Sequence, residues 1–328
     1  MKSFELHTPK TVSEAVSLLD KFGNKSKPLG GGSDLVTGIM KDWVQGKGMP
    51  LPEYLVDVAS IPAMVGISKT ASAITVGAAT TLTSIMEDDD IKKGFPVLFD
   101  SVTSIASPLI RNFATLGGNL NQRPRCWFLR GNFDCYKKGG DFCFAVTGDN
   151  RFHAIIGGEL CYIVHPSDTA VALLALNAKA KVASPAGERV VPFDAYFIGP
   201  REDVLRENVL KSNEILVNVE IPRLAPNTKT AWTKLKDRQV LDFATVAVAV
   251  VVTQENGVWK DGRIVLGGVS PVPYRAKVVE DALVGKNIKD NIKLAAAAIR
   301  TVARPMSLNA FKVDVTVGMI ERAVLSAL

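Results

Sequence analysis

Residues 27–41 read KPLGGGSDLVTGIMK and set three consecutive glycines between a short apolar strand and the start of a helical pattern. Because glycine has no Cβ atom, the backbone N–H groups of such a turn can approach a phosphate, and the Ser33 hydroxyl adds a donor. The turn is not a Walker loop, since no lysine follows at the required place, and Leu35 breaks the G-x-G-x-x-G pattern. On its own, the turn is compatible with a pyrophosphate cradle and equally with a plain tight turn.

A second glycine turn, TLGGN at residues 115–119, again combines small residues with a hydroxyl and an amide. Two such turns in one domain favour a ligand that carries two phosphates. Around them the hydrophobic pattern alternates between the period of a strand and that of a helix. We expect strands at residues 4–7, 27–29, 54–58 and 73–78, and helices at residues 12–22, 36–41, 81–87, 95–106 and 168–176.

The composition of the sequence changes after residues 222–230. This segment is polar and contains two prolines, and we take it as a domain boundary. Beyond it, residues 244–253 and 262–267 are expected to form an antiparallel pair joined by a turn at residues 255–257. Three helices are expected to follow, near residues 276–283, 292–304 and 317–328.

The composition is that of an ordinary folded protein. The 328 residues suggest two domains, and 47% hydrophobic with 22% charged residues excludes the disordered and collagen-like classes. The net charge is +6, but the basic residues are scattered and form no stripe with interleaved aromatics, so we do not expect nucleic-acid binding. The uncharged runs are far shorter than a membrane span, and the first residues show no export-signal pattern.

The four cysteines gather in one stretch, as Cys126, Cys135, Cys143 and Cys161. A chain with a large core has little need of two disulfides, so the cluster of thiols predicts a metal centre, either zinc or an iron–sulfur cluster. The spacing C-x8-C-x7-C-x17-C lacks the C-x2-C knuckle of structural zinc, and the local excess of Lys and Arg between residues 123 and 151 would offset the negative charge of a cluster. This chemistry favours a [4Fe-4S] cluster over zinc, and zinc over disulfides.

Five motifs, in order along the chain, resemble the FAD-binding medium subunit of the molybdenum hydroxylases, the family of xanthine dehydrogenase, carbon monoxide dehydrogenase and aldehyde oxidoreductase. They are GGSDL at 31–35, IRN at 110–112 followed by TLGGN at 115–119, HPSD at 165–168, EIL at 214–216 followed by EIP at 220–222, and residues 234–242. The resemblance implies an α+β protein. Its parts would be a two-subdomain FAD-binding domain of p-cresol methylhydroxylase type, residues 1–225, and a C-terminal α+β domain of CO dehydrogenase flavoprotein type, an antiparallel sheet with helices, residues 226–328.

The resemblance also implies roles for single residues. The two glycine turns would hold the FAD pyrophosphate, Asp168 would contact the adenosine end, and Leu216 and Lys234 would lie along the flavin. The implied FAD contacts are Leu29, Gly30, Gly31, Gly32, Ser33, Asp34, Leu35, Ile105, Thr115, Gly117, Gly118, Asn119, Gln122, Asp168, Leu216 and Lys234. No catalytic residue is expected on this chain, because the substrate would bind to a partner.

The cysteine segment, at about residues 121–165, is an insertion relative to most medium subunits, which pass almost directly from the second glycine turn to the HPSD position. Such an insertion resembles two branches of the family, the bacterial aldehyde oxidoreductases with a [4Fe-4S] cluster on the flavin subunit and 4-hydroxybenzoyl-CoA reductase. The sequences at 119–126 and 150–155 look more like the aldehyde oxidoreductase branch. We therefore expect Cys126, Cys135, Cys143 and Cys161 to bind one [4Fe-4S] cluster.

The function that the resemblance implies is electron transfer. A molybdopterin-binding large subunit would oxidise an aldehyde, a small subunit with two [2Fe-2S] clusters would relay the electrons, and the FAD of this chain would pass them to an external acceptor. Alternatives are the flavin subunit of a 4-hydroxybenzoyl-CoA reductase-like or xanthine dehydrogenase-like enzyme, a free-standing flavin oxidase, and a flavin-binding module with structural zinc. The expected location is the cytoplasm, or the periplasm by co-export with a signal-bearing partner.

Overall fold

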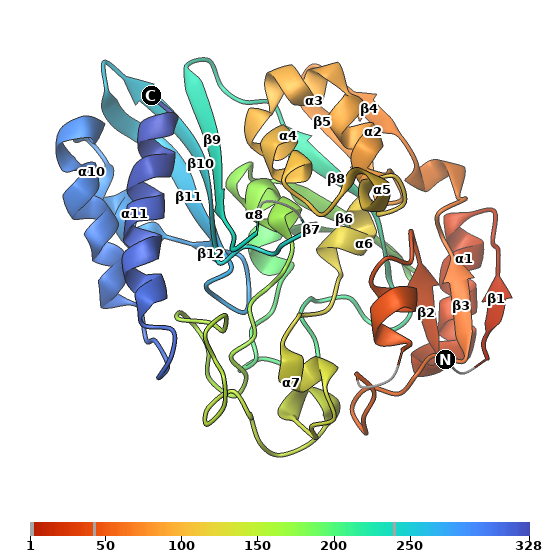
Figure 1. The fold of residues 1–328 in the computed structure, drawn as a ribbon. Coiled ribbons are helices and arrows are strands. Elements are labelled where there is room, and N and C mark those ends of the chain that lie inside the picture. Colours follow the sequence, from red (N-terminus) through yellow and green to blue (C-terminus); the bar gives the residue numbers. More distant parts are fainter. Residues whose placement is uncertain (1–2, 42–43, 239–240) are drawn as a thin grey trace.

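The computed structural model describes residues 3–41, 44–238 and 241–328, which form three sheets with helices packed between and around them (Figure 1). Residues 239 and 240, part of the expected motif at 234–242, lie outside the described residues. In the described part, no helix is both long enough and apolar enough to cross a membrane. The α+β class expected from the sequence is confirmed.

The first sheet is parallel, with the strand order β1-β3-β2. Its strands are β1 (Glu5–His7), β2 (Ser26–Leu29) and β3 (Tyr54–Asp57), and helix α1 (Val12–Phe22) joins the first two. The Thr11 hydroxyl accepts from the N–H of Glu14 and begins the helix, as the sequence predicts. Strand β2 ends directly at the first glycine turn, so this small sheet positions the turn.

The second sheet has five strands in the order β4-β5-β8-β6-β7, all paired antiparallel. They are β4 (Ile67–Lys69), β5 (Ala73–Gly77), β6 (Lys179–Ser184), β7 (Gly187–Pro192) and β8 (Ile215–Pro222). Short helices follow β5 along the chain, namely α2 (Leu82–Glu87), α3 (Asp89–Gly94), α4 (Pro96–Thr103), α5 (Pro108–Arg111) and α6 (Leu116–Leu120). The helix expected at 95–106 is shorter, since Ala106 has a positive φ of 46°.

The third sheet has the order β12-β11-β10-β9 and is antiparallel. Its strands are β9 (Thr228–Leu235), β10 (Val246–Glu255), β11 (Val258–Gly267) and β12 (Tyr274–Arg275). The expected pair and its turn at Asn256 and Gly257 are present, but the sheet is twice as wide as expected because β9 and β12 flank the pair. β8 ends at Pro222 and β9 begins at Thr228, so the connecting loop is shorter than the boundary segment 222–230 that the sequence predicts.

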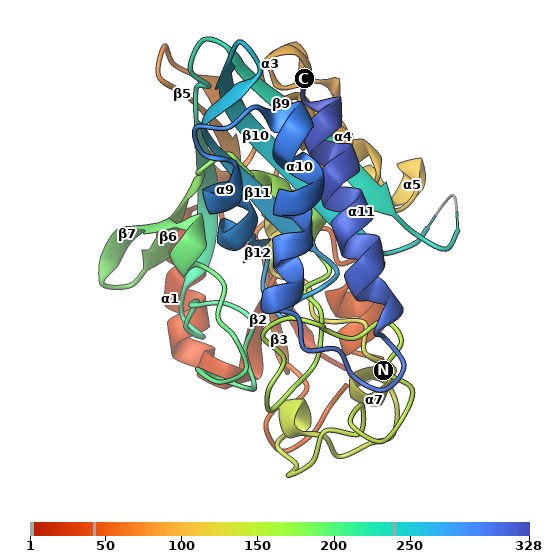
Figure 2. The same ribbon diagram turned by 90° about the vertical axis from the view of Figure 1, so that its left-hand side faces the viewer.

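Helices cover both faces of this third sheet. On one side are α9 (Lys277–Leu283), α10 (Ile288–Ala297) and α11 (Phe311–Ser326), and Figure 2 shows α10 and α11 lying side by side in front of the strands. On the other side α4 and α8 (Asp168–Ala175) pack against it. The expected helices at 292–304 and 317–328 both begin earlier, and the first ends in a 3-10 turn, Ala298–Thr301. Helix α8 is buried along its whole length and lies between the second and third sheets.

The cysteine insertion lies at the foot of the molecule in Figure 1 and has little regular structure. It holds only α7 (Trp127–Arg130) and one 3-10 turn, Tyr136–Lys138. Its Leu129 and Cys135 form a small buried apolar cluster with Val44, which follows the first glycine turn. The last part of the insertion is different, because Ile155 and Ile156 pack into the core between the third sheet and its helices.

Candidate cofactor site

The first glycine turn presents free backbone donors. Within the described chain, the N–H groups of residues 31–35 make no hydrogen bond, whereas those of residues 36–39 all donate to carbonyls at Gly32 or Asp34. A short π-helix, Leu35–Ile39, follows the turn in place of the α-helical pattern expected at 36–41. Consecutive N–H groups without partners at a half-buried turn form a concave site for an anion.

The two glycine turns lie against each other. A Cβ atom on Gly31 would stand 1.7 Å from the carbonyl oxygen of Phe113, and one on Gly30 would stand 2.6 Å from Oγ1 of Thr115. A side chain at Gly31 would therefore collide with backbone, which cannot move without displacing the second turn. Gly32 has a φ of +71°, a conformation that favours glycine. The triple glycine is required by this close approach.

The second glycine turn differs from the first because its donors are used inside the protein. The N–H of Leu116 donates to Thr80 O at 2.9 Å, that of Gly117 to Ala78 O at 2.7 Å, and that of Gly118 to Thr115 Oγ1 at 3.1 Å. The turn is the start of α6, with Thr115 as its N-cap. It therefore supports the first turn from behind and offers an anion few donors of its own.

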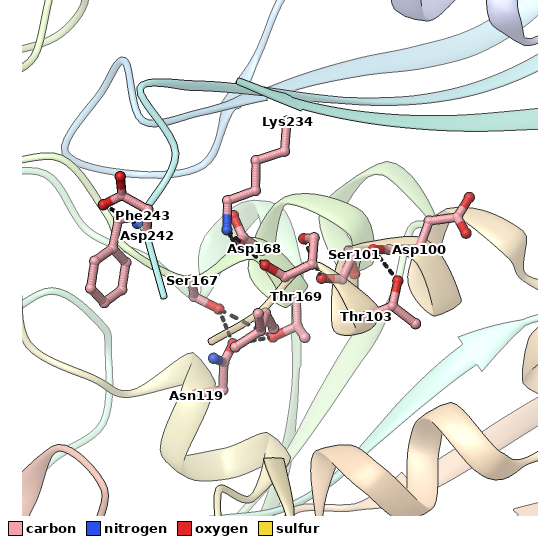
Figure 3. A network of polar contacts seen from close by, with 12 residues as sticks. Asp100, Ser101, Thr103, Asn119, Ser167, Asp168, Thr169, Lys234, Asp242 and Phe243 are labelled. Carbon is pink, nitrogen blue, oxygen red and sulfur yellow. Dashed lines mark hydrogen bonds and ion pairs between the residues drawn. The ribbon is translucent and has the colours of Figure 1, made fainter. Parts of the chain in front are cut away.

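Asn119 connects the second turn to the start of α8. Its Oδ1 accepts from Ser167 Oγ at 2.7 Å and from Thr169 Oγ1 at 2.6 Å, and all three side chains are buried (Figure 3). The backbone oxygen of Asn119 also accepts from Nε2 of Gln122. Among the expected FAD contacts, Asn119 and Gln122 thus fix the backbone between the glycine turn and Asp168.

Asp168 and Lys234 form a buried ion pair, with 2.7 Å between Oδ2 and Nζ (Figure 3). Asp168 is the first residue of α8 and Lys234 comes from β9, so the pair joins the start of α8 to the third sheet. Lys234 also donates to Ser104 O at 3.2 Å. Burial raises the pKa of Asp168, and the ammonium of Lys234 opposes that rise.

Asp34 was expected at the FAD site, and its carboxylate contacts arginines of the insertion. Oδ1 lies 3.1 Å from Nη2 of Arg125 and 2.9 Å from Nη2 of Arg130, and Oδ2 accepts from the N–H of Arg123 at 2.8 Å. The guanidinium of Arg125 also lies 4.7 Å from the centre of the Phe243 ring. Burial lowers the pKa of Arg125 to about 10. Sequence reasoning missed Arg125, whose only signal was the local excess of positive charge.

Most of the basic residues that make up this excess form ion pairs with carboxylates. Glu207 binds both Lys137 at 2.7 Å and Arg123 at 3.2 Å, and Arg151 pairs with Asp149 at 2.7 Å. Burial raises the pKa of Cys135 and Lys138 opposes this rise, while Lys137 opposes the rise in the pKa of Cys161. The positive charge therefore fixes the insertion to the rest of the chain.

Two further expected contacts lie in the core. Leu216 of β8 is 4% exposed and packs in the main hydrophobic cluster, and Ile105 is 9% exposed in the same cluster. Neither lines the cavity at Asp168, which the described residues enclose. The structure thus brings together the glycine turns, Asn119 and Asp168, and places Leu216 and Ile105 behind them.

A cavity of about 240 Å³ opens between the insertion, the start of α8 and the loop between β9 and β10. The residues that matter for its chemistry are Arg125, Cys126, His153, Asp168, Asp242 and Phe243. Burial lowers the pKa of His153 to about 4, with a further contribution from nearby Lys312. Aromatic rings and charged groups thus line the cavity, and Cys126 lines one side of it.

The four cysteines meet at a second, smaller cavity, where all of them are free thiols. The two-disulfide alternative is thus not what the structure contains. A hydrogen bond between Cys143 and Cys161 lowers the pKa of Cys143 to about 6 and raises that of Cys161, and burial raises that of Cys126 to about 11. In the described residues, no three His, Cys, Asp or Glu side chains are arranged to hold a metal ion. The four thiols thus share one small cavity without forming a preorganised metal-ion site among the described residues.

The site combines three features: a turn with free backbone N–H groups, a second glycine turn that packs against it, and a buried aspartate at the start of α8. Together they define a site of the dinucleotide-binding class. Residues 2–224 match the FAD binding domain in molybdopterin dehydrogenase, and residues 231–327 match the CO dehydrogenase flavoprotein C-terminal domain. The chain belongs to this family and is an FAD-binding medium subunit of the molybdenum hydroxylases, of the CO dehydrogenase and aldehyde oxidoreductase type.

Individual relatives resemble the chain along most of its length. The aldehyde oxidoreductase FAD-binding subunit PaoB of Escherichia coli (strain K12) is 30% identical over 291 residues, covering 86% of each chain. The carbon monoxide dehydrogenase medium chain of Hydrogenophaga pseudoflava is 29% identical over 303 residues, covering 92% of this chain and 88% of the relative. A structure of carbon monoxide dehydrogenase from the same organism superposes with a TM-score of 0.77 at 28% identity, covering 99% of this chain and 97% of the other.

Proposed function

We propose that the chain is the flavin and iron–sulfur electron-transfer subunit of a molybdenum-dependent aldehyde oxidoreductase. The observation that carries the proposal is the cysteine insertion, in which four free thiols meet at one cavity beside the larger cavity of Asp168. The likeness to an aldehyde oxidoreductase subunit at 30% identity supports the choice of an aldehyde as the substrate of the complex.

The FAD site that we propose begins at the first glycine turn. The free N–H groups of residues 31–35 would bind the pyrophosphate, and Thr115, Gly117, Gly118 and Asn119 would hold this turn in place from behind. Asp168 would accept a hydrogen bond from the adenosine end while Lys234 neutralises its charge. Bound FAD would supply the chemistry of accepting electrons one at a time and passing them on singly or in pairs, whereas the protein positions it and excludes water.

The cluster site that we propose consists of Cys126, Cys135, Cys143 and Cys161. These side chains come from the start, middle and end of the insertion, so a shared cluster would tie its irregular loops together. The aromatic rings of Phe128, Phe133 and Phe144 pack beside them, with ring centres 5.1–6.3 Å apart, and would shield the cluster from solvent.

We propose the same division of the chain as the resemblance implies. An FAD-binding domain would span residues 1–225 with the cluster insertion at about 121–165, and a C-terminal domain would span residues 226–328. The loop between β8 and β9, the third sheet with its helices, and the two family matches at 2–224 and 231–327 support this division.

The partners that we propose are a molybdopterin-binding large subunit and a small subunit with two [2Fe-2S] clusters. Relatives named as medium chains support a complex with a larger and a smaller chain. Electrons would enter this subunit from the small subunit and leave it for an external acceptor. No aldehyde site is proposed on this chain.

Co-expression with the two partner subunits tests the proposal. We expect the complex to contain FAD and about four iron and four sulfide on this subunit, and to reduce a dye with an aldehyde as donor. The chain purified alone should bind FAD, oxidise no aldehyde, and reduce the dye only after its flavin has been reduced chemically. Zinc in place of iron, or aldehyde oxidation by the isolated chain, would contradict the proposal.

A further inference from the structure

Cys126 lies in the wall that separates the two cavities, because its side chain lines both of them. The other three cysteines line only the smaller cavity. Beside Cys126 stands His153, whose Nε2 is 3.2 Å from Sγ of Cys126 and whose ring lines the larger cavity. The thiol and the imidazole therefore lie, together with Ile163, between the space proposed for the cluster and the space at Asp168.

His153 is held in this position from several sides. Its carbonyl oxygen accepts from Nδ2 of Asn309 at 3.1 Å and from Nζ of Lys312 at 3.0 Å, and both of these side chains are fully buried. Its ring lies 6.0 Å from the rings of Trp127 and Phe128, centre to centre. His153 is 4% exposed, and its Nδ1 has no partner among the described residues. Such a ring has little freedom to turn away from the sulfur.

The direction of the hydrogen bond follows from the chemistry of a ligand thiolate. A cysteine that binds iron is deprotonated and can only accept, so Nε2 of His153 must carry the hydrogen for the 3.2 Å contact to be favourable. A hydrogen bond to a ligand sulfur withdraws negative charge from the cluster and stabilises its more negative, reduced form. Hydrogen bonds to the sulfurs are one of the means by which proteins set cluster potentials.

We propose that His153 is a positioning residue that donates a hydrogen bond from Nε2 to the Cys126 ligand and raises the reduction potential of the cluster. This inference rests on the proposed function, since it requires a cluster on the four cysteines. Cys126 is the one proposed ligand that also borders the cavity at Asp168. No proton is transferred, and the histidine remains a donor in both oxidation states.

The test compares three variants in the complex with its partner subunits. His153→Leu removes the donor, His153→Gln keeps an amide N–H at similar reach, and His165→Leu removes another buried histidine of the same cavity that makes no described hydrogen bond to a cysteine. The midpoint potential of the cluster is measured by redox titration followed by electron paramagnetic resonance. Iron, sulfide and FAD are counted for each protein.

We expect His153→Leu to shift the equilibrium toward oxidised cluster by about tenfold, which is about 59 mV to more negative potential for a one-electron couple. His153→Gln should restore most of the shift, and His165→Leu should leave the potential unchanged. Equal potentials in wild type and His153→Leu would overturn the inference while leaving the cluster assignment intact. Loss of the cluster from both His153 variants with FAD retained would also overturn it, because a hydrogen bond that only sets a potential is not needed to hold four ligands. Absence of iron from the wild type would overturn the proposed cluster itself.

Discussion

The first glycine turn and the cysteine insertion are both candidate cofactor sites, but they are built in opposite ways. Backbone contacts hold the turn in place, because Gly31 packs against the carbonyl oxygen of Phe113 and β2 pairs with β3. Its free N–H groups are therefore preorganised before any ligand binds. The insertion contributes Leu129 and Cys135 to a buried cluster of three residues completed by Val44, and it is attached through charged pairs at Asp34 and Glu207. A site made of backbone donors can be formed in advance, whereas a site made of four side chains on irregular loops depends on its ligand.

The sharpest way to break this comparison is Gly31→Val. The new side chain would collide with Phe113 O, so the turn should lose its shape and FAD content should fall by about a hundredfold or more, while the iron content of the insertion stays unchanged. FAD is measured by absorbance after release, and iron by chemical analysis. The control is Gly199→Val, where a Cβ would meet nothing within 4 Å. Equal FAD content in the two variants would show that the turn is not preformed as described.

The second prediction concerns the opposite region. Under the proposed function, Cys135→Ser, or treatment with a chelator, should remove the proposed cluster and make residues 121–165 sensitive to protease, because little apolar surface orders these loops. FAD should remain bound, and cleavage sites should be mapped by mass spectrometry. The matched change Ser17→Ala, on the exposed side of α1, should alter neither property. Simultaneous loss of FAD would mean that the two sites form one cooperative unit.

The third prediction tests how the flavin region is joined to the third sheet. Lys234→Met leaves Asp168 buried without its partner and should lower the free energy of unfolding by about 3–5 kcal/mol near pH 8. Burial already raises the pKa of Asp168, and loss of the ammonium raises it further. The native state then holds the proton more tightly than the unfolded state, so the defect should shrink as the pH falls and grow as the pH rises through the pKa of Asp168. Urea unfolding at pH 5 and pH 8 measures the difference, and an equal defect at both would contradict the ion pair.

The smallest expected effect concerns the hydrogen bonds that hold the last part of the insertion. Nδ2 of Asn309 donates to the carbonyls of Asn150, His153 and Ala154, and Asn309→Ala should destabilise the protein by about 2 kcal/mol. Asn291→Ala, which removes an exposed hydrogen bond within α10, should change stability by less than about 0.5 kcal/mol. Both values come from denaturant unfolding. Faster release of iron from the Asn309 variant alone would show that this residue supports the cluster region.

Most features that depend on residues close together in the sequence could be predicted from it, whereas contacts between distant residues could not. The capping box of α1, the glycine turns and the gathered cysteines each depend on residues a few positions apart, and the structure contains all three. The strands β6 and β7 went unassigned, although they form a local hairpin, and the pairing of β6 with the later strand β8 was not predicted either. The pairing of Asp34 with Arg125 and Arg130 spans about ninety positions, so no spacing rule could have separated it from a ligand contact. Leu216 was assigned to the flavin by resemblance, whereas its burial depends on how β8 packs.

Asn309 and Lys312 hydrogen-bond to the last part of the insertion, and Asn309 is separated from its partner Asn150 by 159 positions. At a translation rate of about 5–20 residues per second, roughly ten to thirty seconds pass between the synthesis of the two partners. During that interval the insertion is made without its two buried supports. Under the proposed function, delivery of iron to the four cysteines would be completed only after this late contact has formed, and the newly made thiols would need protection from oxidants until α11 has folded.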